Sequence, residues 1–118
     1  MPELADILDS FCRLDGVHGA LVLAAGGDIR EERFSEPRDT APLAEVVRRS
    51  LEAGSRLAEA LQKGGLNQQY VEFANSQITS EMLQGGQTLV VVADTGANLG
   101  RIRLEIRKNK KAVEGCLA

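Results

Sequence analysis

The sequence predicts an α+β fold with the element order helix, two strands, helix, three strands, helix. The first observation is the unbroken apolar run from Leu89 to Ala93. Such a run is typical of a strand covered on both faces, because a half-solvated strand would alternate in polarity. The second is a long amphipathic pattern over residues 43–63, and the third is a set of short segments separated by turn residues. Together they predict a central buried strand with helices packed around it.

Composition suits one globular domain spanning residues 1–118. The chain has 118 residues, 43% of them apolar, and a domain of this length buries about two thirds of its unfolded surface. Aromatic side chains are scarce, which argues against base stacking, so we expect no nucleic-acid partner.

The net charge is −3, yet Asn98 to Lys111 carries six basic residues and one acidic residue. That segment could meet an acidic partner, membrane phosphates or nucleic acid, or it could be a solvated helix face.

The cysteines and the N-terminal residues predict a cytoplasmic protein. Cys12 and Cys116 are the only cysteines and form no C-x-x-C pair, so neither a zinc site nor a thioredoxin-type motif is indicated. The acidic N-terminus lacks the basic and apolar regions of a signal peptide. No apolar run approaches the roughly 20 residues needed to span a bilayer. We therefore expect reduced thiols and no membrane span.

The first third of the chain predicts a helix followed by a hairpin. Apolar residues at helical spacing begin near Leu4, and the helix should end near Gly16. Residues 18–25 form an apolar run, and the Gly-Gly-Asp sequence at 26–28 indicates a hairpin turn. The next strand, Ile29 to Ser35, carries charges in its middle, which suits a sheet edge that must resist stray pairing.

The longest helix is predicted from Leu43 to Lys63, with Gly64 and Gly65 ending it. One apolar stripe runs along it, formed by Leu43, Val46, Val47, Ser50, Leu51, Gly54, Leu57, Ala58 and Leu61. The opposite face is charged and offers three i,i+4 ion pairs, Glu45–Arg49, Glu52–Arg56 and Glu59–Lys63. A glycine costs about 1 kcal/mol relative to alanine inside a helix. Gly54 therefore indicates a close backbone approach, to the sheet or to a second helix, unless it is a tolerated accident.

Three strands and a helix complete the predicted order. Gln68 to Ala74 and Ile78 to Leu83 show strand-like patterns, and two glycines then turn the chain into the central strand. Asn98 is placed to cap a helix. The apolar side chains after this cap recur at helical spacing as far as Val113, although those at 102, 104 and 106 also alternate as in a strand. The longer stripe and the strong helix formers favour the helix.

The sequence contains no recognisable catalytic, cofactor or metal motif. The segments GGDIRE and GANLGR have neither Walker-loop nor dinucleotide-binding spacing. His18 is the only histidine, and nothing in the sequence places a nucleophile or an orienting acid beside it. We therefore expect no enzyme activity, no cofactor and no metal.

The segment GALVLAAGGDIREERF, the long helix and the segment QTLVVVADTGANLGRIRLEIRK together resemble the Roadblock family of dynein light chains and bacterial GTPase regulators. The match runs from about Leu4 to Val113, and the chain is most similar to the MglB-like bacterial branch. The resemblance implies a five-stranded antiparallel sheet in the order 2-1-5-4-3, with the long helix on one face and the N- and C-terminal helices on the other. It also implies a homodimer in which the third strands pair edge to edge and the long helices meet.

The resemblance further implies that the chain regulates a small Ras-like GTPase, either activating it or only binding it, without catalytic groups of its own. The alternative is a scaffold or adaptor subunit of a larger complex, and a third possibility is a small-molecule sensor. The expected dimer interface comprises Ser50, Gly54, Leu57, Tyr70, Val71 and Phe73. The expected GTPase-binding face of the long helix comprises Glu45, Arg48, Arg49, Glu52 and Arg56.

Overall fold

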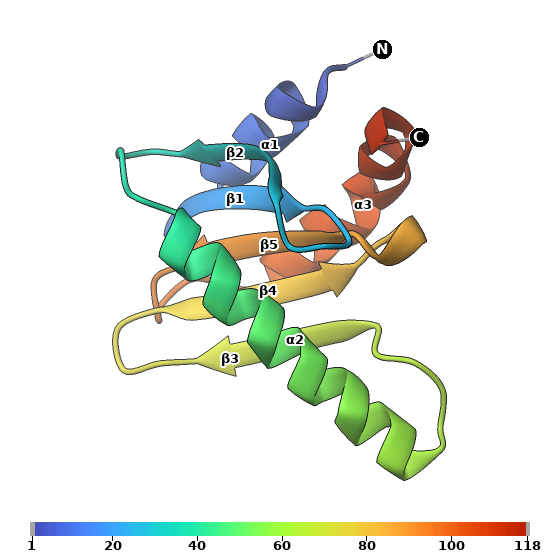
Figure 1. Ribbon diagram of the computed structural model, residues 1–118. Coiled ribbons are helices and arrows are strands. Elements are labelled where there is room, and N and C mark those ends of the chain that lie inside the picture. The colour runs from blue at the N-terminus through green and yellow to red at the C-terminus, as the bar shows by residue number, and fades with distance from the viewer. Residues whose placement is uncertain (1, 118) are drawn as a thin grey trace.

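A computed structural model describes residues 2–117 of the chain (Figure 1). The elements follow the predicted order, with one additional short 3-10 turn. They are α1 (Leu4–Cys12), β1 (Val17–Leu23), β2 (Ile29–Phe34), α2 (Ala41–Leu61), β3 (Gln68–Glu72), β4 (Gln77–Met82), η1 (Gln84–Gly86), β5 (Thr88–Ala93) and α3 (Leu99–Leu117).

The five strands form one sheet in the order β2-β1-β5-β4-β3, and every neighbouring pair is antiparallel. Helix α2 crosses one face of the sheet, while α1 and α3 lie on the other (Figure 1). This three-layer arrangement confirms the predicted fold class and strand order. It leaves β2 and β3 as the two outer strands, with β5 at the centre.

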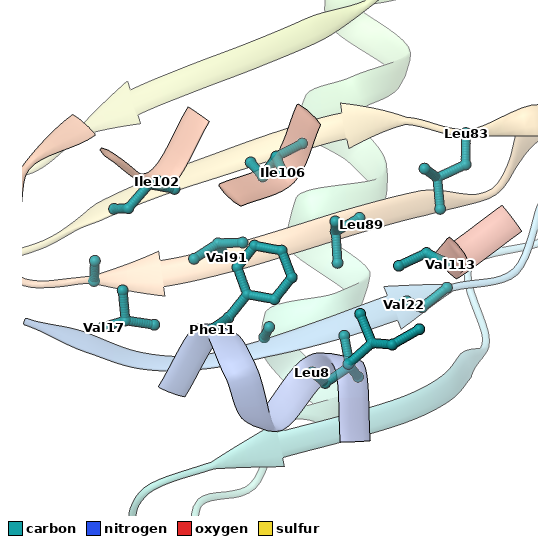
Figure 2. Close-up of a cluster of buried hydrophobic side chains, with 13 residues drawn as sticks. Leu8, Phe11, Val17, Val22, Leu83, Leu89, Val91, Ile102, Ile106 and Val113 are labelled. Carbon is teal, nitrogen blue, oxygen red and sulfur yellow. The ribbon is translucent and has the colours of Figure 1, made fainter. Parts of the chain in front are cut away.

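Strand β5 separates two hydrophobic cores, because its alternate side chains enter opposite layers. Leu89 and Val91 point into the core beneath α1 and α3, which Figure 2 shows around Phe11. Val90 and Val92 point into the second core, beneath α2. All six residues of the strand are buried, so the prediction of a strand covered on both faces is confirmed.

Helix α3 resolves the conflict between helical and strand periodicity in favour of the helix. Ile102, Ile106 and Val113 are buried against the sheet, as Figure 2 shows. Leu104 points away from them and remains 60% exposed. The Asn98 side chain accepts a hydrogen bond from the Arg101 amide at 3.1 Å, which is the predicted helix cap.

Helix α2 departs from its predicted bounds and burial. It ends at Leu61 rather than at Lys63, because Gln62 takes the left-handed conformation (φ 54°) and its amide bonds back to the carbonyl of Ala58. The predicted Glu59–Lys63 pair is lost with that last turn. The helix runs diagonally and its C-terminal turns extend past β3 (Figure 1), so only three of its residues are buried, namely Ala44, Val47 and Leu51.

Strand β3 is two residues shorter than predicted. It ends at Glu72, because the Phe73 amide donates to the Ser76 carbonyl at 2.7 Å and starts a turn. At the other side of the sheet, Gly19 lies opposite Phe34 in the β1–β2 ladder. A Cβ atom on Gly19 would lie 2.2 Å from the Phe34 ring, so the glycine makes room for an aromatic side chain that covers the strand.

Candidate interaction surface

Strand β3 presents an open edge. Among the strands within residues 2–117 it pairs only with β4, so its other row of backbone groups has no ladder partner there. Val71 stands opposite Ile78, whose side chain packs on the α2 side of the sheet, while Tyr70 points to the α3 side. Both side chains are half-buried, and Phe73, just beyond the strand, is 49% exposed. An outer strand with little charge and accessible apolar side chains favours pairing with another strand.

A second apolar feature runs along α2, on a side of the helix that the sheet does not cover. Val46, Leu57 and Leu61 are 64%, 62% and 59% exposed. Their spacings of 11 and four residues bring them to one side of the helix, because a helix turns once every 3.6 residues. We call these three residues and Phe73 the apolar strip. Val46 and Leu61 were not among the predicted interface residues, although their positions in the stripe carried the signal.

The small residues Ser50 and Gly54 contact β3 within the same chain. The Ser50 hydroxyl donates to the Gln69 side-chain oxygen at 3.1 Å, and the Gln69 amide nitrogen lies 3.4 Å from the Ser50 carbonyl oxygen. A Cβ on Gly54 would lie 2.9 Å from that nitrogen and 3.0 Å from the Leu66 side chain. Of the two close approaches considered for Gly54, the structure therefore contains the one to the sheet. A contribution of Ser50 and Gly54 to a dimer stays a prediction.

The charged face of α2 is held by ion pairs between neighbouring turns. Glu45 lies 3.0 Å from both Arg48 and Arg49, and Arg48 also pairs with Glu52. Hydrogen bonds from Arg48 and then Arg49 lower the pKa of the Glu45 carboxyl. The predicted Glu45–Arg49 pair is confirmed, whereas Glu52 pairs with Arg48 instead of Arg56 within the described chain.

The five predicted GTPase-binding residues differ in how freely they face outward. The stem of Arg48 packs over the β1–β2 turn, where a Cβ on Gly27 would lie 2.4 Å from the Arg48 Cδ, and its side chain is only 33% exposed. By contrast, the Arg49 side chain is 71% exposed, and Arg56 and Glu52 are exposed as well. Arg49 and Arg56 are therefore the cations on this face that are most accessible to a partner.

One side-chain pair outside this surface was not predicted. His18 Nε2 lies 2.6 Å from Asp94 Oδ1, and both side chains are about half exposed. Ser35 donates its hydroxyl to the His18 backbone carbonyl, not to the ring. The nearby hollow of about 710 Å³ at the start of α3 has a mixed lining, with Arg13, Asp15 and Arg101 beside Leu14 and Ile102. It is therefore not the mostly apolar pocket that is typical of a small-molecule site.

Two further kinds of feature are absent from residues 2–117. No group of three or more histidine, cysteine or acidic side chains is arranged to hold a metal ion in that part of the chain. None of the helices described there has the length and apolar character required to cross a membrane.

The fold and its exposed features define a sheet-and-helix module suited to binding other proteins, with an open strand edge beside an apolar strip. The model of the Roadblock/LC7 domain family matches residues 3–93. The chain belongs to this family. The match ends with β5, so the basic helix α3 lies outside it. No curated protein matches the sequence.

Solved structures confirm the fold. A Roadblock/LC7 domain from Streptomyces avermitilis is 18% identical, with a TM-score of 0.88 and 98% of each chain covered. MglB from Myxococcus xanthus is 19% identical, with a TM-score of 0.86 over 97% of this chain and 94% of that one. The gliding protein MglB from Thermus thermophilus is 20% identical, with a TM-score of 0.86 over 96% of this chain and 87% of that one.

Proposed function

We propose that this protein is a homodimeric, non-enzymatic regulator that binds a small Ras-like GTPase. The observation that carries the proposal is the open edge of β3 next to the apolar strip of α2. Membership of the Roadblock/LC7 family supports a regulatory role, and the resemblance of the sequence to the MglB-like branch of bacterial GTPase regulators supports the GTPase as the partner class.

The dimer forms by antiparallel pairing of β3 with the same strand of a second copy. This pairing gives the open edge a full set of backbone hydrogen bonds and joins two five-stranded sheets into one. Because α2 lies on one face of the sheet, the two-fold axis brings both long helices to the same side. There, Leu57 and Leu61 can bury the apolar area that a single chain exposes to water.

The GTPase docks across the two long helices. Their outward faces combine acidic and basic side chains, which suits electrostatic steering and a defined orientation more than it suits tight apolar packing. The exposed Arg49 and Arg56 are the cations most available for this contact. In this proposal the protein positions the GTPase's own catalytic residues and supplies none itself.

Charge reversal on α2 tests the GTPase surface. The probes are the small Ras-like GTPases encoded in the same genome, each loaded with GDP or with a non-hydrolysable GTP analogue, and binding is followed by biolayer interferometry. Arg49→Glu/Arg56→Glu should weaken binding of the GTP form about tenfold or more, chiefly through the association rate and most strongly at low salt. Arg48 is unsuitable, because reversing it would also disturb the packing over Gly27.

The matched control is Arg103→Glu/Arg107→Glu on α3, which reverses two exposed arginines on the opposite face of the sheet. If only this control variant loses GTPase binding, the proposed GTPase surface on α2 is wrong. GTPase binding with no change in its hydrolysis rate would assign the protein to the adaptor class. No binding by any of these GTPases would refute the proposal.

A further inference from the structure

Helix α3 carries a concentrated positive charge on its exposed face. Five exposed cations lie on this helix, namely Arg101, Arg103, Arg107, Lys108 and Lys111. None of them has a carboxylate oxygen within 4.0 Å in the described part of the chain. The helix lies outside the part of the chain that the family model matches.

The acidic side chains of α3 are already engaged and do not neutralise this face. Glu105 accepts a hydrogen bond from the Asn109 amide at 3.3 Å, one turn further along the helix. Glu114 accepts a hydrogen bond from the backbone amide of Gln84 at 2.7 Å, and so ties the helix to the turn before β5. The helix carries six basic residues against these two carboxylates, for a net charge of +4, so positive charge is in excess on it.

A groove runs beside this basic face, between α3 and the strands β3 and β4. It has a volume of about 260 Å³, and Arg103 and Arg107 form one wall with Ile106 between them. Glu81 is the acidic residue in its lining, and both of its oxygens are occupied, one by Gln68 and one by Lys110, each at 2.9 Å. Three cations, Arg103, Arg107 and Lys110, therefore line the groove against one carboxylate, and its net charge is positive. The Arg103 Nε donates to the Gln68 side-chain oxygen at 2.9 Å, so a ligand would meet the two terminal nitrogens of this guanidinium.

We propose that this groove binds an extended acidic segment of a partner protein, with carboxylates on alternate residues. Arg103 and Arg107 lie one helical turn apart, about 6 Å along the helix. Alternate side chains of an extended chain are spaced by about 7 Å, so two successive carboxylates on one side of such a segment can each meet a guanidinium. Arginine suits this contact, because its planar fork binds a carboxylate through two hydrogen bonds.

A polypeptide fits the surroundings better than a lipid bilayer or a nucleic acid does. Helix α1 packs beside α3 on the same face of the sheet and contributes the exposed Asp6, whereas Asp9 is turned toward β2 and pairs with Arg33 at 3.4 Å. A broad anionic surface laid over α3 would bring its own charges against Asp6. A single extended chain in the groove avoids this carboxylate, because the groove lies on the side of α3 that faces β3 and β4.

The test is fluorescence anisotropy with a labelled peptide of about twelve residues in which Glu alternates with Thr, compared with its Gln analogue and its Lys analogue. The Glu peptide should bind the wild-type protein, and the Gln analogue should not. Binding should weaken as sodium chloride rises from about 50 mM to about 300 mM. Arg103→Glu/Arg107→Glu should reduce affinity for the Glu peptide about tenfold or more and create affinity for the Lys analogue.

The matched control is Arg49→Glu/Arg56→Glu, which changes net charge equally on the other face of the sheet and should leave peptide binding unchanged. Because the groove lies within one protomer, the result does not depend on the dimer or on the GTPase. The proposal is overturned if the Glu peptide does not bind, or if both reversals weaken it equally. Phosphatidylserine vesicles, a DNA duplex and polyglutamate are compared as competitors at equal concentrations of negative charge. The proposal is also overturned if the vesicles or the DNA displace the peptide more readily than polyglutamate does. The basic face of α3 would then bind a membrane or a nucleic acid.

Discussion

Truncating Leu57 should weaken the dimer while leaving the protomer folded. Full burial of a leucine contributes about 1.5–3 kcal/mol, and Leu57 exposes 62% of its surface in the single chain. Covering that fraction in the dimer would contribute about 1–2 kcal/mol per copy. Each dimer contains two copies of Leu57, and alanine retains part of the contact. Leu57→Ala should therefore weaken the free energy of dimerisation by about 2–3 kcal/mol. The dimer dissociation constant should then rise about 30- to 150-fold.

Sedimentation velocity over a dilution series measures this change, since the protomer has a mass of 12.7 kDa. Leu104→Ala is a matched control, because Leu104 is 60% exposed but lies on α3, on the other face of the sheet. The two variants should have equal thermal stability, since exposed substitutions change unfolding free energy by about 0.5 kcal/mol or less. If both variants dimerise like wild type, or if wild type is a monomer at tens of micromolar, the proposed interface is wrong.

Three further predictions concern the fold. Gly19→Ala should destabilise the protein by about 1–3 kcal/mol in urea unfolding, because its Cβ would meet the Phe34 ring at 2.2 Å. Gly26→Ala is the control and should be near neutral, because its Cβ would meet no atom within 4 Å. Equal losses of stability in the two variants would contradict the close packing of Phe34 on Gly19. Gln62→Gly should raise the free energy of unfolding by about 1 kcal/mol in the same urea experiment, since glycine adopts φ 54° without strain. A lower free energy of unfolding would contradict this prediction. The pKa of Glu45 is lowered by its arginine neighbours, so its contribution is present at neutral pH and lost as the pH falls through that pKa. Melting temperatures at about pH 7 and pH 3 should therefore differ less for Glu45→Gln than for wild type.

Local patterns predicted most of the architecture because burial leaves a periodic trace in the sequence. The uninterrupted apolar run of β5 required cover on both faces, and the structure places two cores there. The ambiguity in α3 arose because residues 102, 104 and 106 satisfy two periods at once. The longer stripe reaching Val113 and the strong helix formers favoured the helix, and the complete burial of Val113 agrees with it. The order of the strands needed the family resemblance, because periodicity within a strand does not specify its neighbours.

The candidate surface was predicted less completely, for a physical reason. An amphipathic stripe shows which side of a helix avoids water, but not what covers that side. Val47 and Leu51 are covered by the sheet, whereas Leu57 and Leu61 belong to the same stripe and remain exposed. The His18–Asp94 contact joins residues 76 positions apart and leaves no local pattern. The packing of Arg48 on Gly27 could not be predicted from the sequence either, because it depends on where the β1–β2 turn lies in the fold.

The central position of β5 has a consequence for synthesis on the ribosome. The β1–β2 and β3–β4 hairpins are joined in the sheet only through β5, and Val17 pairs with Ala93 near the end of the chain. Until residues 88–93 leave the exit tunnel, the nascent chain holds two separate hairpins, each with an unsatisfied inner edge. Folding of the whole sheet must therefore wait until residues 88–93 have left the tunnel. Ribosomes stalled before this point would carry chains prone to aggregate, whereas those stalled well after it would carry a sheet already closed.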